Sequence, residues 1–592
     1  MVALCSLIPS AGYAENSLMG RYSPDQRSYT SEHLQLPIAL NWDFTTTKFA
    51  GNAASPVVDG NKCIFSSGDR IYAVDLESGK MLWRYPDQPL NSTVKCTPAI
   101  SDGSVYFGSG DGNLYCIDEE TGKFQWAYQT RGPIRCPPVV YEGVVYVGTD
   151  DNSVYAIDSG SGEAIWRRPY TTKDDVTYGI AVSLGMVVVS SMDGNLYGIS
   201  ASTGALRWYY RLPSAPIRTS PIISESLVIM AVGDAVYGFT ARSGQMRWLV
   251  NMPAEVAAPP ACDGDVLYVA CRDKKIYAYK LNTRQPSVKW TAPADFGSLP
   301  LSSPVVADDT LYITGSKGVV GAFATEDGAM RWRYIIGPSA DFGKVYTDAA
   351  SSPTIANGNL IVLTDDGVLH CFASGAPDSE KPQVFAMKPQ NGYAISDVPP
   401  FKISAIVYDI GSGVDFSTVN LSLDGLSLDY DVDFSTSTIT SIYGLSTEGK
   451  PVKKLVSGVH TVRLVGKDYA GNVMDEQWIF YADSRLPPPK QPTVATGKRT
   501  KDPVTGQQGT PNANRNIGNN PNYGGNQGRG NSRDGRDGRD RRGDGGRGGY
   551  DRGGYGRGGP PGSDYGIGGP PPPPTTQPMP GPGSGMPPGA PR

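Results

Sequence analysis

Short runs of apolar and β-branched residues alternate with polar turns from about residue 38 to residue 374. In one copy of this pattern the runs lie at residues 97–100, 105–109, 114–118 and 124–128. Asp-Gly or Thr-Gly turns separate the runs, and such turns supply the positive φ that tight hairpins need. Each copy therefore predicts a four-stranded antiparallel meander.

One tryptophan recurs in the copies, in the fourth run. The series is Trp42, Trp83, Trp126, Trp166, Trp208, Trp248, Trp290 and Trp332, with steps of 40 to 43 residues by subtraction. A fixed period in the low forties is typical of repeat proteins. A single meander cannot bury both of its faces, so the copies must pack on one another, and radial packing gives a β-propeller. Eight tryptophans predict eight blades.

The two ends of the repeat region complement each other. The last copy, residues 352–372, has three strands and no tryptophan, whereas residues 38–44 offer a fourth strand with no partner before it. Pairing them would complete the eighth blade and remove two exposed sheet edges. We therefore predict an all-β fold with an eight-bladed propeller at residues 38–374, closed by its N-terminal strand.

Residues 72–83 have the sequence motif Tyr-Ala-Val-Asp-x-x-Ser-Gly-Lys-x-x-Trp, and related motifs recur at 115–126 and 155–166. This motif resembles the tryptophan-docking repeat of quinoprotein (PQQ-like) propellers. The resemblance implies that each tryptophan packs between neighbouring blades and that the turn glycine lets the chain pass beneath it. Later copies replace the aspartate with Ser200, Thr240 and Lys280. The eight tryptophans are therefore expected to be mainly structural.

The quinoprotein family contains dehydrogenases and non-catalytic platforms. The resemblance implies that a dehydrogenase would hold pyrroloquinoline quinone in its axial funnel, with a vicinal Cys-Cys disulfide, a calcium held by Glu and Asn, an Asp base and long inserts between blades. This chain has eight cysteines with no two adjacent, and its repeats are compact. It is more similar to the non-catalytic, BamB-like branch. We expect no enzymatic activity and no cofactor, with a PQQ-dependent dehydrogenase as the alternative.

Histidine chemistry is not indicated either. His33, His370 and His460 fall in three separate regions. That separation argues against a histidine metal cluster and against a Ser-His-Asp triad. No catalytic residue is predicted.

In blades two to five, a polar residue lies two or three positions before the proline of the first strand or its equivalent, namely Lys95, Arg135, Thr177 and Arg218. The first strand is innermost in a propeller, so we expect these side chains near one mouth of the axial channel. Three cations there could hold a carboxylate or an extended acidic peptide. Alternatively, they pair with local aspartates such as Asp174 and Asp175, or point to solvent. We take Lys95, Arg135 and Arg218 as candidate partner-binding residues.

Residues 384–484 lose the forty-residue period. The phrases Asp-x-Gly-Ser-Gly-Val-Asp at 409–415 and Asp-x-Ala-Gly-Asn at 468–472 resemble those of bacterial Ig-like domains. They predict a β-sandwich that binds partners or acts as a spacer. Loop oxygens that could converge on calcium are those of Asp409, Asp415, Asp468 and Asn472. Turn stabilisation explains these residues equally well, so no metal site is assigned.

The two ends of the chain have no repeat. Residues 1–37 are expected to be signal-like or disordered, because a short apolar run precedes Gly-Tyr-Ala, which resembles a secretory cleavage site after Ala14. Residues 485–592 are rich in Gly, Pro and Arg and are expected to be disordered. Their Arg-Gly-Gly phrases resemble RNA-binding boxes, so RNA binding through the tail is a further alternative.

No stretch of roughly 20 apolar residues predicts a transmembrane helix. The body outside the tail is acidic, which does not favour nucleic acid as its partner. The sequence thus favours an exported scaffold that binds protein or other envelope partners through propeller loops and the channel mouth. Its expected location is the periplasm, the outer membrane or the cell surface, with possible peripheral association through the tail.

Overall fold

A computed structural model describes residues 17–46, 54–90, 92–213, 217, 219–281, 284–337, 347–444 and 454–487. Within these ranges the structure is built from strands and contains one 3-10 turn, η1 (Ser316–Gly318), but no α-helix. None of the described segments forms a helix that could span a membrane.

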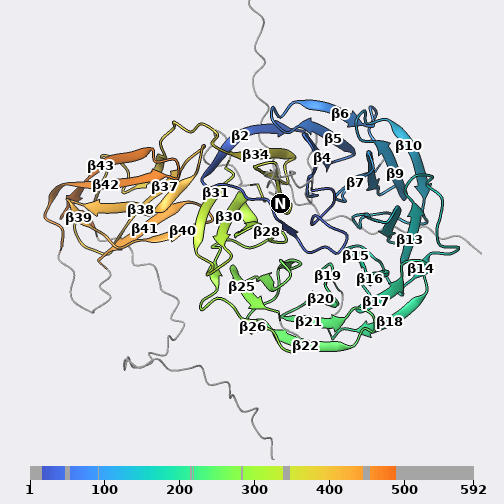
Figure 1. The fold of residues 1–592 in the computed structure, drawn as a ribbon. Coiled ribbons are helices and arrows are strands. Elements are labelled where there is room, and N and C mark those ends of the chain that lie inside the picture. The colour runs from blue at the N-terminus through green and yellow to red at the C-terminus, as the bar shows by residue number, and fades with distance from the viewer. Residues whose placement is uncertain are drawn as a thin grey trace, which may run out of the picture. The chain divides into compact units, whose positions relative to one another are not determined.

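Eight antiparallel sheets follow one another around a common axis (Figure 1). Blade 1 contains β3 (Val57–Asp59), β4 (Lys62–Ser67), β5 (Arg70–Asp75) and β6 (Met81–Tyr85). Blade 2 contains β7 (Ala99–Ser101), β8 (Ser104–Gly108), β9 (Asn113–Asp118) and β10 (Phe124–Gln129). Blade 3 contains β11 (Val139–Tyr141), β12 (Val144–Gly148), β13 (Ser153–Asp158) and β14 (Tyr170–Thr171). Blade 4 contains β15 (Ile180–Ser183), β16 (Met186–Ser190), β17 (Asn195–Ser200) and β18 (Leu206–Arg211).

The remaining blades continue in chain order. Blade 5 contains β19 (Ile222–Ser224), β20 (Leu227–Val232), β21 (Ala235–Thr240) and β22 (Met246–Asn251). Blade 6 contains β23 (Ala261–Cys262), β24 (Val266–Ala270), β25 (Lys275–Lys280), β26 (Ser287–Val288) and β27 (Ala294–Asp295). Blade 7 contains β28 (Val305–Ala307), β29 (Thr310–Thr314), β30 (Val319–Ala324), β31 (Met330–Ile335) and the added β1 (Tyr29–Thr30). Blade 8 contains β32 (Thr354–Ala356), β33 (Asn359–Leu363), β34 (Val368–Ser374) and β2 (Ile38–Thr45).

Blade 8 joins the two ends of the repeat region. Strand β2 pairs antiparallel with β34, and Trp42 lies opposite Cys371. The predicted eight-bladed all-β fold and its closure by the N-terminal strand are therefore confirmed. Closure leaves the innermost strand of each blade facing the axis.

Six of the eight tryptophans connect their own blade to the next one through a hydrogen bond. The Nε1 atom of Trp42 donates to the carbonyl of Leu76 at 2.9 Å, and a Cβ on Gly79 would lie 2.6 Å from the indole ring. The same two contacts recur for Trp83 with Gly122, Trp126 with Gly162, Trp166 with Gly204, Trp208 with Gly244 and Trp290 with Gly328. A side chain on the turn glycine would collide with the ring, so this contact requires glycine.

Two tryptophans depart from this arrangement. The copy after Trp248 has no turn glycine, and the buried Trp248 Nε1 has no hydrogen-bond partner among the described residues. Trp332 donates to the carbonyl of Ser412, which belongs to the second module rather than to a blade. The tryptophan series thus also provides a docking point for the second module.

The second module consists of two sheets around one apolar core. One sheet contains β35 (Gln383–Lys388), β37 (Phe401–Tyr408), β41 (Thr438–Tyr443) and β40 (Asp431–Asp433). The other contains β36 (Ala394–Ser396), β43 (Val473–Asp483), β42 (Gly458–Asp468), β38 (Val414–Leu423) and β39 (Leu426–Ser427). Trp478 and Phe480 are buried in the core between them. This arrangement is a β-sandwich, and its kinship with bacterial Ig-like domains stays a prediction.

The N-terminal segment differs from the expectation of a signal-like or disordered stretch over residues 1–37. Residues 1–16 lie outside the described residues, but residues 17–37 are placed, and β1 pairs in parallel with β28 of blade 7. The inner edges of the closed ring offer free backbone groups to this segment. Its polar composition carries no strand pattern, so the sequence alone did not predict this pairing. The tail expected to be disordered lies outside the described residues from Pro488 onward.

Candidate functional site

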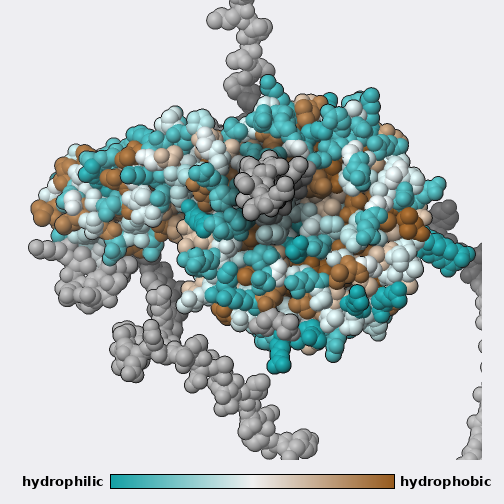
Figure 2. Space-filling model, viewed as in Figure 1, coloured by the Kyte–Doolittle hydropathy of each residue, from teal (hydrophilic) through white to brown (hydrophobic). Residues whose placement is uncertain are grey.

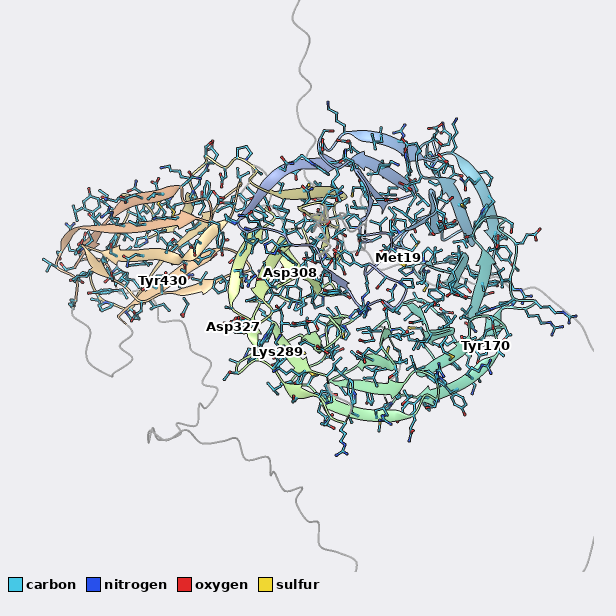
Figure 3. The ribbon with its side chains drawn as sticks, in the orientation of Figure 1. Met19, Tyr170, Lys289, Asp308, Asp327 and Tyr430 are labelled. Atoms are coloured by element: carbon cyan, nitrogen blue, oxygen red, sulfur yellow. The ribbon has the colours of Figure 1, made fainter. Side chains whose placement is uncertain are left out.

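The N-terminal segment lies across the axis of the propeller. Its carbonyl groups accept hydrogen bonds from backbone N–H groups on the innermost strands of six blades, at Val58, Ile100, Val182, Ile223, Cys262 and Val306. The hydroxyl of Tyr22 contacts the backbone of Ile355 in blade 8. A segment can reach seven blades at once only at the axis. Figure 3 shows Met19 of this segment inside the ring and Tyr170 on the outer side of blade 3.

Arg21 anchors this segment at the axis. Its guanidinium is buried, donates to the carbonyl of Pro260, and donates through Nε to the hydroxyl of Ser28 at 2.8 Å. Burial lowers the pKa of Arg21 to about 9. The Nη1 atom has no hydrogen-bond partner among the described residues. A buried cation with an unused donor is therefore available at the axis.

An axial cavity of about 140 Å³ lies beside this segment, with Gly20 and Arg21 in its lining. Its walls come from the residues just before the innermost strands of all eight blades. Five of these wall residues are hydroxyl residues that precede a proline, namely Ser55, Thr97, Ser220, Ser303 and Ser352. The cavity is therefore small and lined by hydroxyl groups.

The same hydroxyls connect neighbouring blades. The amide of Ser352 donates to Ser55 Oγ, and the amide of Ser55 donates to Thr97 Oγ1, each at 3.0 Å. The Ser220 hydroxyl donates to the carbonyl of Tyr178 at 2.7 Å. These hydroxyl residues were not among the site residues predicted from the sequence. The recurring Ser/Thr-Pro pair in five copies was the signal that could have identified these residues.

The predicted cations are placed as follows. Lys95 is exposed before the first strand of blade 2. The side chain of Arg135 is 54% exposed, and its Nη1 lies 3.0 Å from the carboxylate of Asp150. Arg218 lies outside the described residues. Arg135 therefore pairs with a local aspartate, which is a different one from Asp174 and Asp175.

Asp150 contacts two residues of the set that precedes the first strands, Arg135 and Thr177. Thr177 Oγ1 also donates to its carboxylate, at 3.3 Å. Nearby, burial and the negative charges of Asp150 and Asp174 raise the pKa of Asp175. The exposed Tyr178 directly follows Thr177 in the sequence and lines the axial cavity. The mouth at blades 3 and 4 thus combines one arginine, several carboxylates and an exposed aromatic ring.

The four loop residues considered for calcium do not all meet. Asp409 and Asp468 lie together, with Asp378 as a third carboxylate that the sequence did not single out. Asn472 bonds to Asp468 through its amide and its side chain, at 2.8 Å each. Asp415 instead accepts from the amide of Ser417 at 3.0 Å.

The axial cavity lined by the described residues is too small for a quinone cofactor. A cavity of about 140 Å³ lies below the roughly 300–1,000 Å³ of small-molecule sites. The N-terminal segment fills the adjoining axial space through its contacts with seven blades. The seven described cysteines are buried and free, and no two are adjacent in the sequence. No reaction step through a quinone is derived for these residues.

Comparisons with known proteins agree with this fold. The family model described as "Beta-alanine-activating enzyme, beta-propeller" matches residues 53–372, which is more than half of the chain. A search of curated proteins finds no match.

Solved structures with this fold include two quinohemoprotein alcohol dehydrogenases. ADHIIG from Pseudomonas putida HK5 has 13% identity and a TM-score of 0.50, and the match covers 64% of this chain and 84% of that one. The enzyme from Comamonas testosteroni has 14% identity and a TM-score of 0.50, with 63% and 82% covered. BamB from Moraxella catarrhalis has 17% identity and a TM-score of 0.44, with 58% and 99% covered. At these identities the likeness concerns the fold alone.

Proposed function

The chain belongs to the family of the beta-alanine-activating enzyme β-propeller, and we propose that it is a non-enzymatic, exported scaffold. It binds protein partners through the mouth of its axial channel and the neighbouring loops. The β-sandwich is its second module, and the domain limits are those expected from the sequence, at 38–374 and 384–484.

The observation that carries this proposal is the position of residues 17–30 at the axis. Hydrogen bonds from the innermost strands hold the segment there, so the chain itself fills the space where a funnel cofactor would lie. A propeller with a filled axis can still present its loops to a partner. Binding at the rim of the channel is therefore favoured over catalysis inside it.

The mouth has the composition of a protein-binding surface. Tyr178 is 40% exposed, and Arg135 and Lys95 are exposed on the adjoining blades. Tyrosine and arginine are enriched among residues that dominate binding energies at interfaces. Arg135 also contacts the carboxylate of Asp150 at 3.0 Å. A partner with both a carboxylate and an apolar side chain fits this surface.

Figure 2 shows hydrophilic residues over much of the rim of the ring, with apolar residues among them. A mixed surface of this kind suits a partner that associates with a folded protein. It offers Tyr178 as an aromatic anchor beside charged neighbours.

The predicted signal cleavage site is compatible with the position of the axial segment. Cleavage after Ala14 would make Glu15 the first residue, and the carbonyl of Ser17 already accepts a bond from Val58. The expected cleavage site thus falls just before the segment that the propeller needs. Mass spectrometry of the purified native protein should give Glu15 as its first residue, whereas an intact Met1 would contradict export by this route.

Site-specific photo-crosslinking tests partner binding at the mouth. A photoreactive phenylalanine replaces Tyr178 in one full-length protein and Tyr209 in a matched control. Tyr209 is 63% exposed but lies on β18, the outer strand of blade 4. A discrete crosslinked species is expected from position 178 and not from position 209. Equal products at both positions, or none at either, would overturn the proposed surface.

Charge reversal at Lys95 and Arg135 provides the second arm of this test. The double substitution to glutamate should reduce the crosslink from position 178 at least tenfold. Glutamate at Lys123, an exposed cation in the turn before β10, should leave the crosslink unchanged. An undiminished crosslink in the double variant would mean that these cations do not contact the partner.

The alternative of a PQQ-dependent dehydrogenase is tested by titration with the cofactor. Full-length protein mixed with PQQ and calcium should show no saturable quinone absorbance and no dye reduction with alcohols. A stoichiometric complex with turnover would replace the scaffold proposal. RNA binding through the tail concerns residues outside the described part and is tested by truncation at Leu486.

A further inference from the structure

Three carboxylates from separate parts of the chain meet in the β-sandwich. Asp378 lies in the linker between β34 and β35, Asp409 directly follows β37, and Asp468 ends β42. One oxygen from each lies within 4.8 Å of the others. Asp409 is 4% exposed and Asp468 is 3% exposed, so two of the three are buried.

Three backbone amides and one side-chain amide donate hydrogen bonds to the three carboxylates. The amide of Ser412 donates to Asp378 Oδ2, and the amide of Gly413 donates to Asp409 Oδ2, each at 2.8 Å. Asn472 donates to both oxygens of Asp468. These bonds hold the carboxylates in place but are fewer than the group can accept.

One oxygen of the group has no partner. Asp409 Oδ1 is buried and accepts no hydrogen bond from the described residues. An unsatisfied buried carboxylate oxygen costs several kcal/mol unless a proton or a cation compensates it. The unpartnered oxygen can therefore accept a proton or contact a cation.

We propose that the carboxylates of Asp378, Asp409 and Asp468 bind one calcium ion. All three side chains offer oxygen, which is the donor that hard cations prefer. Two oxygens bound to one calcium lie at most about 4.6 to 5.2 Å apart, given bond lengths of 2.3–2.6 Å, whereas magnesium limits them to about 4.2 Å. The three carboxylate oxygens lie within 4.8 Å of one another, so a single calcium ion can contact all of them.

The same loop holds the β-sandwich on the propeller. Ser412 accepts from Trp332, Gly411 accepts from the amide of Leu40 at 3.1 Å, and Ile410 accepts from the hydroxyl of Tyr334 at 2.6 Å. These residues directly follow Asp409. The linker that carries Asp378 joins the two modules. Calcium would thus fix the loop and the linker together and strengthen the docking of one module on the other.

Calorimetric titration of the full-length protein with CaCl₂ at pH 7.5 tests the site directly. One ion per chain is expected, with a Kd on the order of 10⁻⁴ to 10⁻³ M, as in extracellular modules. MgCl₂ should bind at least tenfold more weakly. Calcium at 5 mM should raise an unfolding midpoint by about 5 °C relative to EDTA. No saturable heat and no shift in the wild-type protein would overturn the proposal.

Two substitutions and a matched control localise the ion. Asp409→Asn should abolish the calcium-dependent shift, and so should Asp378→Asn, which changes a partly exposed linker residue with little risk to folding. Asp415→Asn should keep the full shift, because Asp415 lies in a neighbouring turn outside the cluster. Calcium binding that persists in both Asp409→Asn and Asp378→Asn would place the ion elsewhere and overturn the assignment.

Discussion

The indole nitrogen of Trp332 donates a hydrogen bond to the backbone carbonyl of Ser412 at 2.8 Å. Six other tryptophans of the series make the equivalent bond to the next blade, at 2.8 to 3.2 Å. The second module thus uses a contact that elsewhere joins two blades. Trp332 is fully buried, and Ser412 is 1% exposed.

Removing this bond should weaken the docking of the β-sandwich. Trp332→Phe keeps an aromatic ring but leaves the buried carbonyl of Ser412 without its donor, which costs about 1–3 kcal/mol. Trp248→Phe is the matched control, because the Nε1 of Trp248 has no bond to lose among the described residues. Urea unfolding should show a larger loss of stability for Trp332→Phe. Equal losses would mean that the bond to Ser412 contributes nothing.

The turn glycines should be irreplaceable only beneath an indole ring. Gly79 and Gly60 both have positive φ, at 67° and 52°. A Cβ on Gly79 would lie 2.6 Å from Trp42, whereas one on Gly60 meets no atom within 4 Å. Gly79→Ala should therefore cost about 1–3 kcal/mol more than Gly60→Ala in urea unfolding. Similar costs would indicate that backbone strain alone decides the effect.

The axial segment should stabilise the whole ring. A chain that begins at Ser31 lacks the acceptors for the inner-strand amides of six blades, so its thermal midpoint should fall by at least about 5 °C. A chain that begins at Glu15 keeps these acceptors and should match the full-length protein. If both truncated chains melt alike, the axial segment does not support the ring.

The described cysteines should resist thiol reagents in the folded protein. Burial raises the pKa of Cys96 and of Cys136 to about 12. The reactive thiolate forms only as the pH rises toward the pKa, so at pH 8 roughly one thiol in 10⁴ is ionised. Reaction with Ellman's reagent should be slow at pH 8 and complete within minutes in denaturant. Rapid labelling of the chain that begins at Glu15, which lacks Cys5, would contradict this burial.

The contacts along the tryptophan series were predictable because they are periodic. Each copy spans about one blade, so the residues that join adjacent blades recur at a constant spacing, as Trp42 and Gly79 do. The closure was predictable for the same reason, because the strand around Trp42 lacked the partner that the last copy provides.

The candidate site was less predictable from the chain. The position of Lys95 and Arg135 before the first strands indicated the channel mouth, but the pairing of Arg135 with Asp150 depends on a loop of the folded blade. Arg21 and the other axial residues lie outside any repeat, so no spacing could indicate their bonds to seven blades.

The number of blades, the closure and the tryptophan contacts could be predicted from the amino-acid sequence, because local periodicity specifies neighbours that are close along the chain. Three features became visible only in the folded chain: the N-terminal segment lies at the axis, Trp332 contacts the second module, and Asp378 lies beside Asp409 and Asp468. Asp378 and Asp468 are separated by 90 positions, by subtraction of their numbers. Contacts of that kind arise when separately folded elements pack together, and no repeating pattern records them.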